Sequence, residues 1–225
     1  MKTNKNKLFF TGFAFIIAFV VWTTLIQVVD VQSIGVNNTN VGLATINRWF
    51  HSLTGVNMTL YTVTDWLGLI PIFVCMLFGF MGLVQWIKRK SLLKVDFSVI
   101  ISGIYYVIVI LCYLIFEEIT INYRPILING VMEASYPSST TLLVLCVMPT
   151  LVFLTNRMLK SNKIKSAISV ITFLFSSFMV MGRLISGVHW LTDIMGSVFL
   201  SMGLFCIYKS IIIMKENEGD FYGIW

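Results

Sequence analysis

The sequence predicts an all-α integral membrane protein in which six transmembrane helices form a bundle. Two observations lead to this fold class. Hydrophobic residues make up 57% of the 225 residues and charged residues only 12%, which is about half the charged share of a soluble domain. In addition, six apolar stretches approach the roughly 20 residues that cross a bilayer as a helix. The same composition excludes disordered, collagen-like and disulfide-rich classes.

The six apolar stretches are the six predicted spans. The first follows three lysines, as a signal peptide does, but it is longer than a signal core and no cleavage site stands out, so we expect it to be retained. The sequence shows no internal repeat or linker, and we expect a single domain over residues 1–225. The six predicted spans are 8–29, 66–87, 97–116, 138–155, 166–182 and 190–214.

Basic residues are distributed unequally between the two ends of this bundle. Thirteen of the 16 lysines and arginines fall at the N-terminus, in the second and fourth connections, and at the end of the sixth span. The other side holds three: Arg48, Arg124 and Arg183. Because positively charged connections stay in the cytoplasm, both termini are predicted to be cytoplasmic. This distribution, despite a net charge of +6, is typical of membrane topology and not of a nucleic-acid-binding groove.

The first connection on the opposite side, residues 30–65, is long and polar. It contains the stretch NRWFHSLTG, residues 47–55, in which polar and aromatic residues are interspersed. This stretch is expected to form a short amphipathic helix at the membrane interface, with Trp49 and Phe50 turned inward.

Ionisable residues gather at the start of the sixth span, in the stretch GRLISGVHWLTD, residues 182–193. If the helix begins near His189, then His189 and Asp193 lie on one face, one turn apart. The carboxylate can then accept a hydrogen bond from one imidazole nitrogen and leave the other free to attack or to take a proton. Arg183 offers a planar fork that matches phosphate oxygens. A lone histidine here is more often a headgroup contact, and a lone aspartate more often a helix cap, but the combination with Arg183 favours a catalytic site.

Two further stretches on the same side would complete an anion site. YPSSTT, residues 136–141, is typical of a helix N-terminus. Its free amides and the Ser138 and Ser139 hydroxyls form a cradle for an anion, and simple capping is the equally good alternative. In EEITINYRP, residues 117–125, the proline after Arg124 favours an extended exit from the third span. This exit would hold the guanidinium toward the same pocket.

Arg-Pro, then Pro-Ser-x-x, then Arg-x5-His-x3-Asp, in this order on one side of a six-helix chain, resembles the type 2 phosphatidic acid phosphatase superfamily. This group includes lipid phosphatases and the vanadium haloperoxidases. The resemblance implies that His189 attacks phosphorus and forms a phosphohistidine, with Asp193 as its orienting carboxylate. It also implies that Arg124, Arg183 and Ser138 bind the phosphate. It implies no metal, and we expect no other cofactor.

The sequence departs from the family motifs at four positions. Glu117 stands where the first motif has a lysine, and Gly182 where the third has a serine. In the second motif Ser139 replaces a glycine, and Thr140 replaces the histidine that protonates the leaving group. Threonine cannot donate that proton near neutral pH, and such general-acid help is worth roughly 10²–10⁴-fold in rate. A phosphate that leaves from a diphosphate needs little help, which favours a polyprenyl diphosphate, whereas Glu117 opposes binding of so charged a substrate. A partly buried Glu117, Glu118 or Glu133 is an alternative proton donor.

We therefore expect a lipid phosphatase that removes phosphate from a lipid phosphate or a polyprenyl diphosphate at the outer face of a prokaryotic plasma membrane. The alternative is a catalytically impaired homologue that binds phosphorylated lipids through Arg124 and Arg183 without turnover. A transporter is disfavoured because the polar residues cluster at one surface and no repeat is visible. The expected partners are the phosphorylated lipid and the surrounding membrane lipids, with no nucleic acid, and the sequence leaves the oligomeric state open.

Overall fold

The computed structural model describes residues 2–222, with side chains described for residues 6–216. Six of its helical segments are long and apolar enough to cross a membrane, which confirms the predicted fold class. The cytoplasmic location of both termini stays a prediction. Two short 3-10 helices, η1 (Val36–Asn38) and η2 (Leu92–Lys94), lie in connections. The α-helices are α1 (Lys2–Val28), α2 (Ala44–Thr54), α3 (Met58–Leu67), α4 (Leu69–Arg89), α5 (Phe97–Glu118), α6 (Ser139–Met158), α7 (Asn162–Ile185) and α8 (Leu191–Tyr222).

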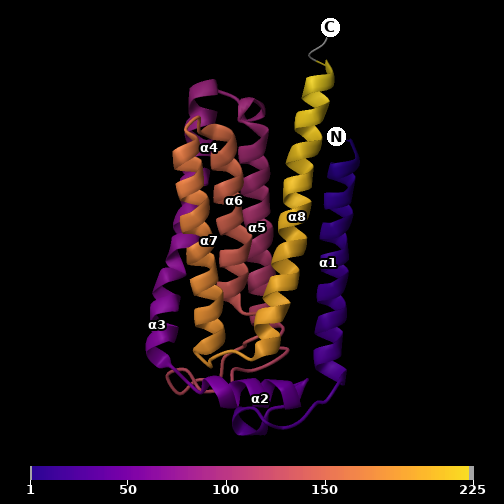
Figure 1. Cartoon of the computed structure of the whole chain (residues 1–225), viewed down its shortest axis with the longest axis vertical. Coiled ribbons are helices and arrows are strands. Elements are labelled where there is room, and N and C mark those ends of the chain that lie inside the picture. The colour runs from indigo at the N-terminus through magenta and orange to yellow at the C-terminus, as the bar shows by residue number, and fades with distance from the viewer. Residues whose placement is uncertain (1, 223–225) are drawn as a thin grey trace.

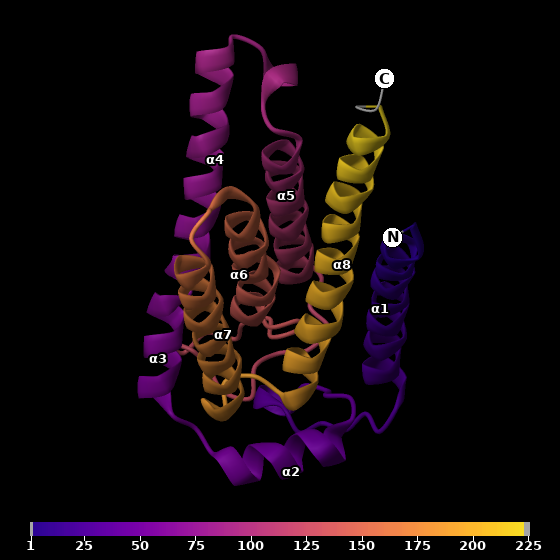
Figure 2. The ribbon, with the colours of Figure 1, turned by 45° about the horizontal axis from the view of Figure 1, so that its top comes forward.

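The long helices stand side by side in one bundle, and α2 lies across one end of it (Figure 1). The N- and C-terminal ends of the chain both lie at the opposite end from α2 (Figure 2). Helix α1 packs along α8, and α6 packs against α4, α5, α7 and α8, so α6 is the central helix. Helix α1 therefore joins the rest of the bundle mainly through α8, which in turn packs on α6.

The second span begins earlier than the sequence indicates. The sequence predicts a polar connection up to residue 65, but the structure has a helical segment from Met58 to Arg89 that is long enough to span a membrane. Asn57 starts this segment, because its side chain accepts a hydrogen bond from a first-turn amide at 2.9 Å. The segment is interrupted at Gly68, three residues before Pro71, whose ring disfavours a continuous helix. The interruption separates α3, which packs against α7, from α4, which packs against α5 and α6.

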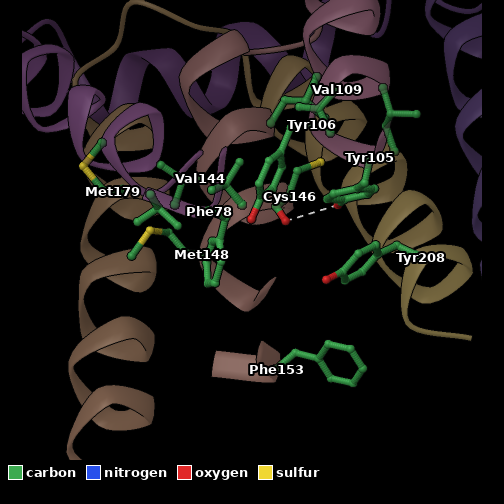
Figure 3. Packing of buried hydrophobic residues seen from close by; sticks show 14 of the residues in the cluster. Phe78, Tyr105, Tyr106, Val109, Val144, Cys146, Met148, Phe153, Met179 and Tyr208 are labelled. Carbon is green, nitrogen blue, oxygen red and sulfur yellow. Dashed lines mark hydrogen bonds between the residues drawn. The ribbon is translucent and has the colours of Figure 1, made fainter. Parts of the chain in front are cut away.

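Tyrosines fill much of the space between α5, α6 and α8, and their hydroxyls are paired inside the bundle (Figure 3). Tyr105 donates to the Cys146 carbonyl at 3.1 Å, and the Tyr208 and Ser102 hydroxyls are 2.8 Å apart. Backbone and side-chain polar groups must find partners inside a membrane protein, since hydrocarbon offers none. These bonds therefore fix the three helices relative to one another at specific points.

Helix α2 closes one end of the bundle, and its buried polar residue is Asn47. Its side-chain amide donates to the Gly42 carbonyl at 2.9 Å and to the Thr192 hydroxyl at 3.0 Å. Its side-chain oxygen accepts from the Thr192 amide at 3.2 Å. The short helix predicted around residues 47–55 therefore exists and is anchored to the start of α8. Trp49 is exposed on the surface of the protein and Phe50 is partly buried, and their insertion into the membrane interface stays a prediction.

Replacing Asn47 by alanine is expected to lower the thermal unfolding midpoint of the protein in detergent. The change leaves the buried Thr192 hydroxyl and amide without partners, and each unsatisfied group costs about 1–3 kcal/mol. Ser52→Ala, at an exposed position of the same helix, is the matched control and should leave the midpoint unchanged. Equal midpoints for Asn47→Ala and wild type would show that these bonds do not hold α2.

Candidate active site

A polar cavity of about 260 Å³ lies at the α2 end of the bundle. Its wall is formed by α3, α5, α6 and α7 and by the connections that follow α5 and α7. The cavity brings together Arg124, Arg183 and His189, which the sequence places in three different motifs. The predicted convergence of these motifs is therefore present in the fold.

His189 lies in the short connection between α7 and α8, with its side chain buried. Its Nδ1 is 3.1 Å from the Ser135 carbonyl oxygen and 3.7 Å from the Asp193 carboxylate. The sequence indicates Asp193 as the hydrogen-bond acceptor, but α8 begins at Leu191, after the histidine, and the Ser135 carbonyl takes that place. Either acceptor puts the hydrogen on Nδ1. Nε2, which then keeps its lone pair, is buried without a partner among the described residues.

Asp193 fixes the backbone that follows His189 in the chain. Its Oδ2 accepts a hydrogen bond from the Trp190 amide at 2.9 Å, and its Oδ1 accepts one from the Asn122 side chain at 3.3 Å. The first bond stabilises the start of α8, and the second ties α8 to the connection after α5. Asn122 and Ser135 are thus supporting residues that no motif indicated.

The two arginines are buried and only partly paired. Arg183, in the last turn of α7, has Nη1 3.5 Å from Asp65, and Arg124 has Nε 3.1 Å from Glu133. Nevertheless, Nε and Nη1 of Arg124 and Nε of Arg183 make no hydrogen bond within the described part of the chain. Buried guanidinium groups with unused donors indicate that an anionic ligand completes the site.

Tyr61 on α3 is a site residue that the sequence analysis missed. Its ring centroid lies 4.8 Å from the guanidinium carbon of Arg183 and 5.7 Å from that of Arg124, both within cation–π range. Helix α3 comes this close to α7 at Gly182, where a Cβ atom would lie 2.6 Å from Thr64 Cγ2. The glycine that replaces the family's serine is therefore explained by packing. No signal in the sequence marked Tyr61, because its segment reads as a connection.

At the start of α6, the hydroxyls that line the cavity do not include that of Ser138, which the resemblance implies for phosphate binding. Ser138 is the buried N-cap residue, and its Oγ donates to the Thr141 hydroxyl at 3.0 Å, away from the cavity. Ser139 and Thr140 line the cavity in its place. The N-cap side chain makes no cap bond, so the first-turn amides of α6 keep their capacity to face an anion.

Carboxylates also line the cavity, and they include two of the three proposed proton donors. Glu117 and Glu133 are in the wall, together with Asp65. Glu118 is exposed and is not part of the wall. Within the described residues, no group of three or more metal-ligating side chains lies close enough to hold a metal ion.

The connection that carries His189 is packed tightly against the α2–α3 connection. Gly187 has φ of 69°, and a Cβ atom there would lie 1.8 Å from the Gly55 carbonyl oxygen, so a side chain is excluded on both counts. The Gly187 carbonyl lies 3.1 Å from His51 Nε2. The histidine is therefore held on a short, constrained segment.

Burial lowers the pKa of His189 well below its usual value, and the nearby positive charges of Arg124 and Arg183 lower it further. Burial and the two positive charges all disfavour the protonated, charged imidazole, so all three lower the pKa. The imidazole is consequently neutral at neutral pH, with its Nε2 lone pair available.

An apolar cavity of about 430 Å³ adjoins the polar one between α4, α5 and α6. The two cavities share Asp65, Tyr113, Ser139, Thr140 and Leu142. Because these three helices belong to candidate membrane spans, the apolar cavity lies within the membrane-spanning part of the fold, next to the polar cavity.

Comparison with known proteins gives a family and a similar fold. The family model described as the PAP2 superfamily matches residues 72–216. The crystal structure of the first transmembrane PAP2 type phosphatidylglycerolphosphate phosphatase, from Bacillus subtilis, is similar with a TM-score of 0.63 at 16% sequence identity. The alignment covers 92% of this chain and 97% of that chain. No curated protein matches this sequence.

His189 is expected to bind its proton only at a pH below the ordinary histidine value of about 6.5. Nitrogen-15 NMR of histidine-labelled protein in micelles would measure the midpoint, and His51→Gln would assign the signals, since the chain has two histidines. Arg124→Gln should raise the midpoint because it removes one positive charge beside the ring. A wild-type midpoint at or above the ordinary value would contradict the neutral, buried imidazole.

Proposed function

The chain belongs to the PAP2 superfamily, and we propose that it is a membrane lipid phosphatase in which His189 attacks the phosphorus of a lipid phosphate or a polyprenyl diphosphate. The observation that carries this proposal is a set of buried nitrogens around one cavity that make no hydrogen bond within the described part of the chain. They are His189 Nε2, Arg124 Nε and Nη1, and Arg183 Nε. One lone pair and three N–H donors are the complement of a phosphate group with an electrophilic centre.

The phosphate would lie between the two arginines and the first turn of α6. The Arg124 and Arg183 guanidinium groups would bind its non-bridging oxygens, with the Ser139 and Thr140 hydroxyls and the α6 amides on the remaining side. The ring of Tyr61 beneath both guanidinium groups restricts their movement. In this arrangement positive charge meets the phosphate where negative charge accumulates in the transition state.

The reaction proceeds in two steps through the histidine. In the first, His189 Nε2 bonds to phosphorus and the bond to the lipid oxygen breaks, which leaves a phosphohistidine. The Ser135 carbonyl and the Asp193 carboxylate, which both lie near His189 Nδ1, would stabilise the positive charge that develops on the ring. In the second step water attacks phosphorus and releases inorganic phosphate. Neither step requires a metal in this scheme.

The lipid tail would extend into the apolar cavity between α4, α5 and α6, because that cavity adjoins the polar one and shares five lining residues with it. The site lies at the end of the bundle opposite the two termini. With the termini cytoplasmic, as the basic connections predict, it faces the outer side of a prokaryotic plasma membrane. This placement rests on the charge distribution.

A second candidate function, lipid binding without turnover, is favoured by one observation. Both arginines already have carboxylate partners, Asp65 and Glu133, and Glu117 adds a third carboxylate to the wall. These charges weaken the attraction for a highly charged substrate. This candidate predicts that wild type binds phosphorylated lipid without phosphate release and that binding survives His189→Ala.

Phosphate release by purified protein in detergent tests the proposed function. Wild type is expected to act on at least one of phosphatidate, phosphatidylglycerol phosphate and polyprenyl diphosphate, and His189→Ala should reduce that rate by roughly 10³-fold or more, since loss of a nucleophile leaves only binding and electrostatic catalysis.

An alkaline denaturing quench should trap a phosphorylated protein in wild type and none in His189→Ala. His51→Gln, at the only other histidine of the sequence, is the matched control and should still be phosphorylated. Phosphate release that persists in His189→Ala would refute the nucleophile, and its absence from wild type on all three lipids would support binding without turnover.

The position of the lipid tail has its own test, Ile72→Trp. Ile72 lines the apolar cavity, so the larger side chain should lower kcat/KM for the long-tailed substrate by about tenfold or more, equivalent to about 1.4 kcal/mol of lost tail contact. Hydrolysis of the tail-less p-nitrophenyl phosphate should be unchanged. Ile171→Trp, on an exposed position of α7, is the matched control, and equal effects of the two variants would place the tail elsewhere.

A further inference from the structure

The proton donor for the leaving group must lie where the two cavities meet. In-line displacement sends the leaving oxygen away from the attacking nitrogen, and here the oxygen carries the lipid that extends into the apolar cavity. Thr140, at the position of the family's donor histidine, lines both cavities. Position 140 therefore lies where a proton donor is needed, but its threonine cannot donate a proton near neutral pH.

Two side chains with an acidic group lie at this junction, Asp65 and Tyr113, among the described residues that line both cavities. Asp65 is the ion-pair partner of Arg183 at 3.5 Å, and a carboxylate in that role has no proton to give. Tyr113 carries a phenol, whose ordinary pKa of about 10 keeps it protonated at neutral pH. Serine and threonine hydroxyls are far weaker acids.

The Tyr113 side chain lines both cavities, and charged residues surround its hydroxyl. The hydroxyl lies close enough to Glu117, one helical turn further along α5, to hydrogen-bond with that side chain. The other charges that act on it are Arg124 and Glu133, and all three charged residues line the polar cavity. Tyr113 is 39% exposed, so the residue is not sealed inside the bundle.

We propose that Tyr113 donates the proton to the leaving oxygen and that Glu117 is its positioning residue. The proposal rests on the proposed function and deepens it. As the N–P bond forms and the P–O bond to the lipid breaks, the phenol proton passes to the lipid oxygen. As water then attacks phosphorus, its proton returns to the phenolate, the N–P bond breaks and phosphate leaves. Both steps balance without another reactant.

This assignment links two departures from the family motifs. Glu117 replaces a lysine, and Thr140 replaces the donor histidine. A lysine at position 117 could not accept a hydrogen bond from the phenol, whereas a glutamate can accept one and hold the hydroxyl at the junction. The acidic residue is therefore part of the substituted proton donor and not only a loss of positive charge.

Tyr113→Phe tests the inference, because it removes the proton and keeps the ring. Two substrates are compared. The leaving group of phosphatidate is the lipid alkoxide, and the leaving group of polyprenyl diphosphate is the polyprenyl phosphate. The variant is expected to lower kcat on phosphatidate by about 100-fold or more, the scale of general-acid catalysis, with KM little changed. On the diphosphate, which needs little protonation, the loss should stay below about tenfold, and the trapped phosphoprotein should still form.

Two variants provide the controls. Tyr123→Phe makes the same chemical change outside both cavities and should leave both rates unchanged. Glu117→Gln keeps a hydrogen-bond acceptor beside the phenol, so it should retain more phosphatidate turnover than Tyr113→Phe, whereas Glu117→Leu should not.

Each other outcome overturns the inference. Equal losses on both substrates would assign Tyr113 to binding or folding, and full phosphatidate turnover in Tyr113→Phe would exclude it as the donor. A wild type that hydrolyses only the diphosphate would show that no proton donor operates. A wild type that releases no phosphate from either lipid would overturn the proposed function itself, and this inference with it.

Discussion

The hydrogen bond between His189 Nδ1 and the Ser135 carbonyl is the contact on which the candidate site depends. It fixes the tautomer of the imidazole, and it joins the connection after α5 to the connection before α8. The first connection carries Arg124, so this contact brings the histidine and the Arg124 guanidinium to one cavity, which Arg183 enters from the end of α7. A backbone carbonyl in this role is insensitive to side-chain replacement at position 135. The orientation of the imidazole therefore depends on the path of the main chain at position 135 and not on the side chain there.

The surroundings of this contact are arranged to keep that path fixed. Asn47 anchors α2 to Thr192, Gly187 lets two connections approach closely, and Asp193 holds the start of α8. None of these residues except Asp193 belongs to a recognised motif. Their common effect is to restrain a short, irregular segment that must sit at the end of a bundle, where regular helical hydrogen bonding stops. The rigidity of the site is therefore supplied by the cap that α2 places over the bundle.

Much of this arrangement is readable from the sequence, and the failures have physical causes. Long apolar stretches identify the spans, and motif spacing brings Arg124, Arg183 and His189 together, because the topology places their helix ends on one side. The entry of α3 into the site is not readable, since residues such as Thr62, Thr64 and Asp65 make its segment look like a polar connection. The inward turn of Ser138 is equally hidden, because an N-cap hydroxyl and a ligand-binding hydroxyl occupy the same position in the sequence. Tyr113 carries no motif signal, as an aromatic residue near the end of an apolar span is ordinarily an interface residue.

The junction of the polar and apolar cavities also determines how products would separate. A site that opens to lipid on one side and to a charged cavity on the other sorts its products by solubility: the dephosphorylated lipid stays in the bilayer, and the inorganic phosphate departs into water. Under the proposed function, the two products would leave by different routes and would not compete for one exit. Because each product would enter a separate phase, the reverse encounter would require both to return to the junction at once.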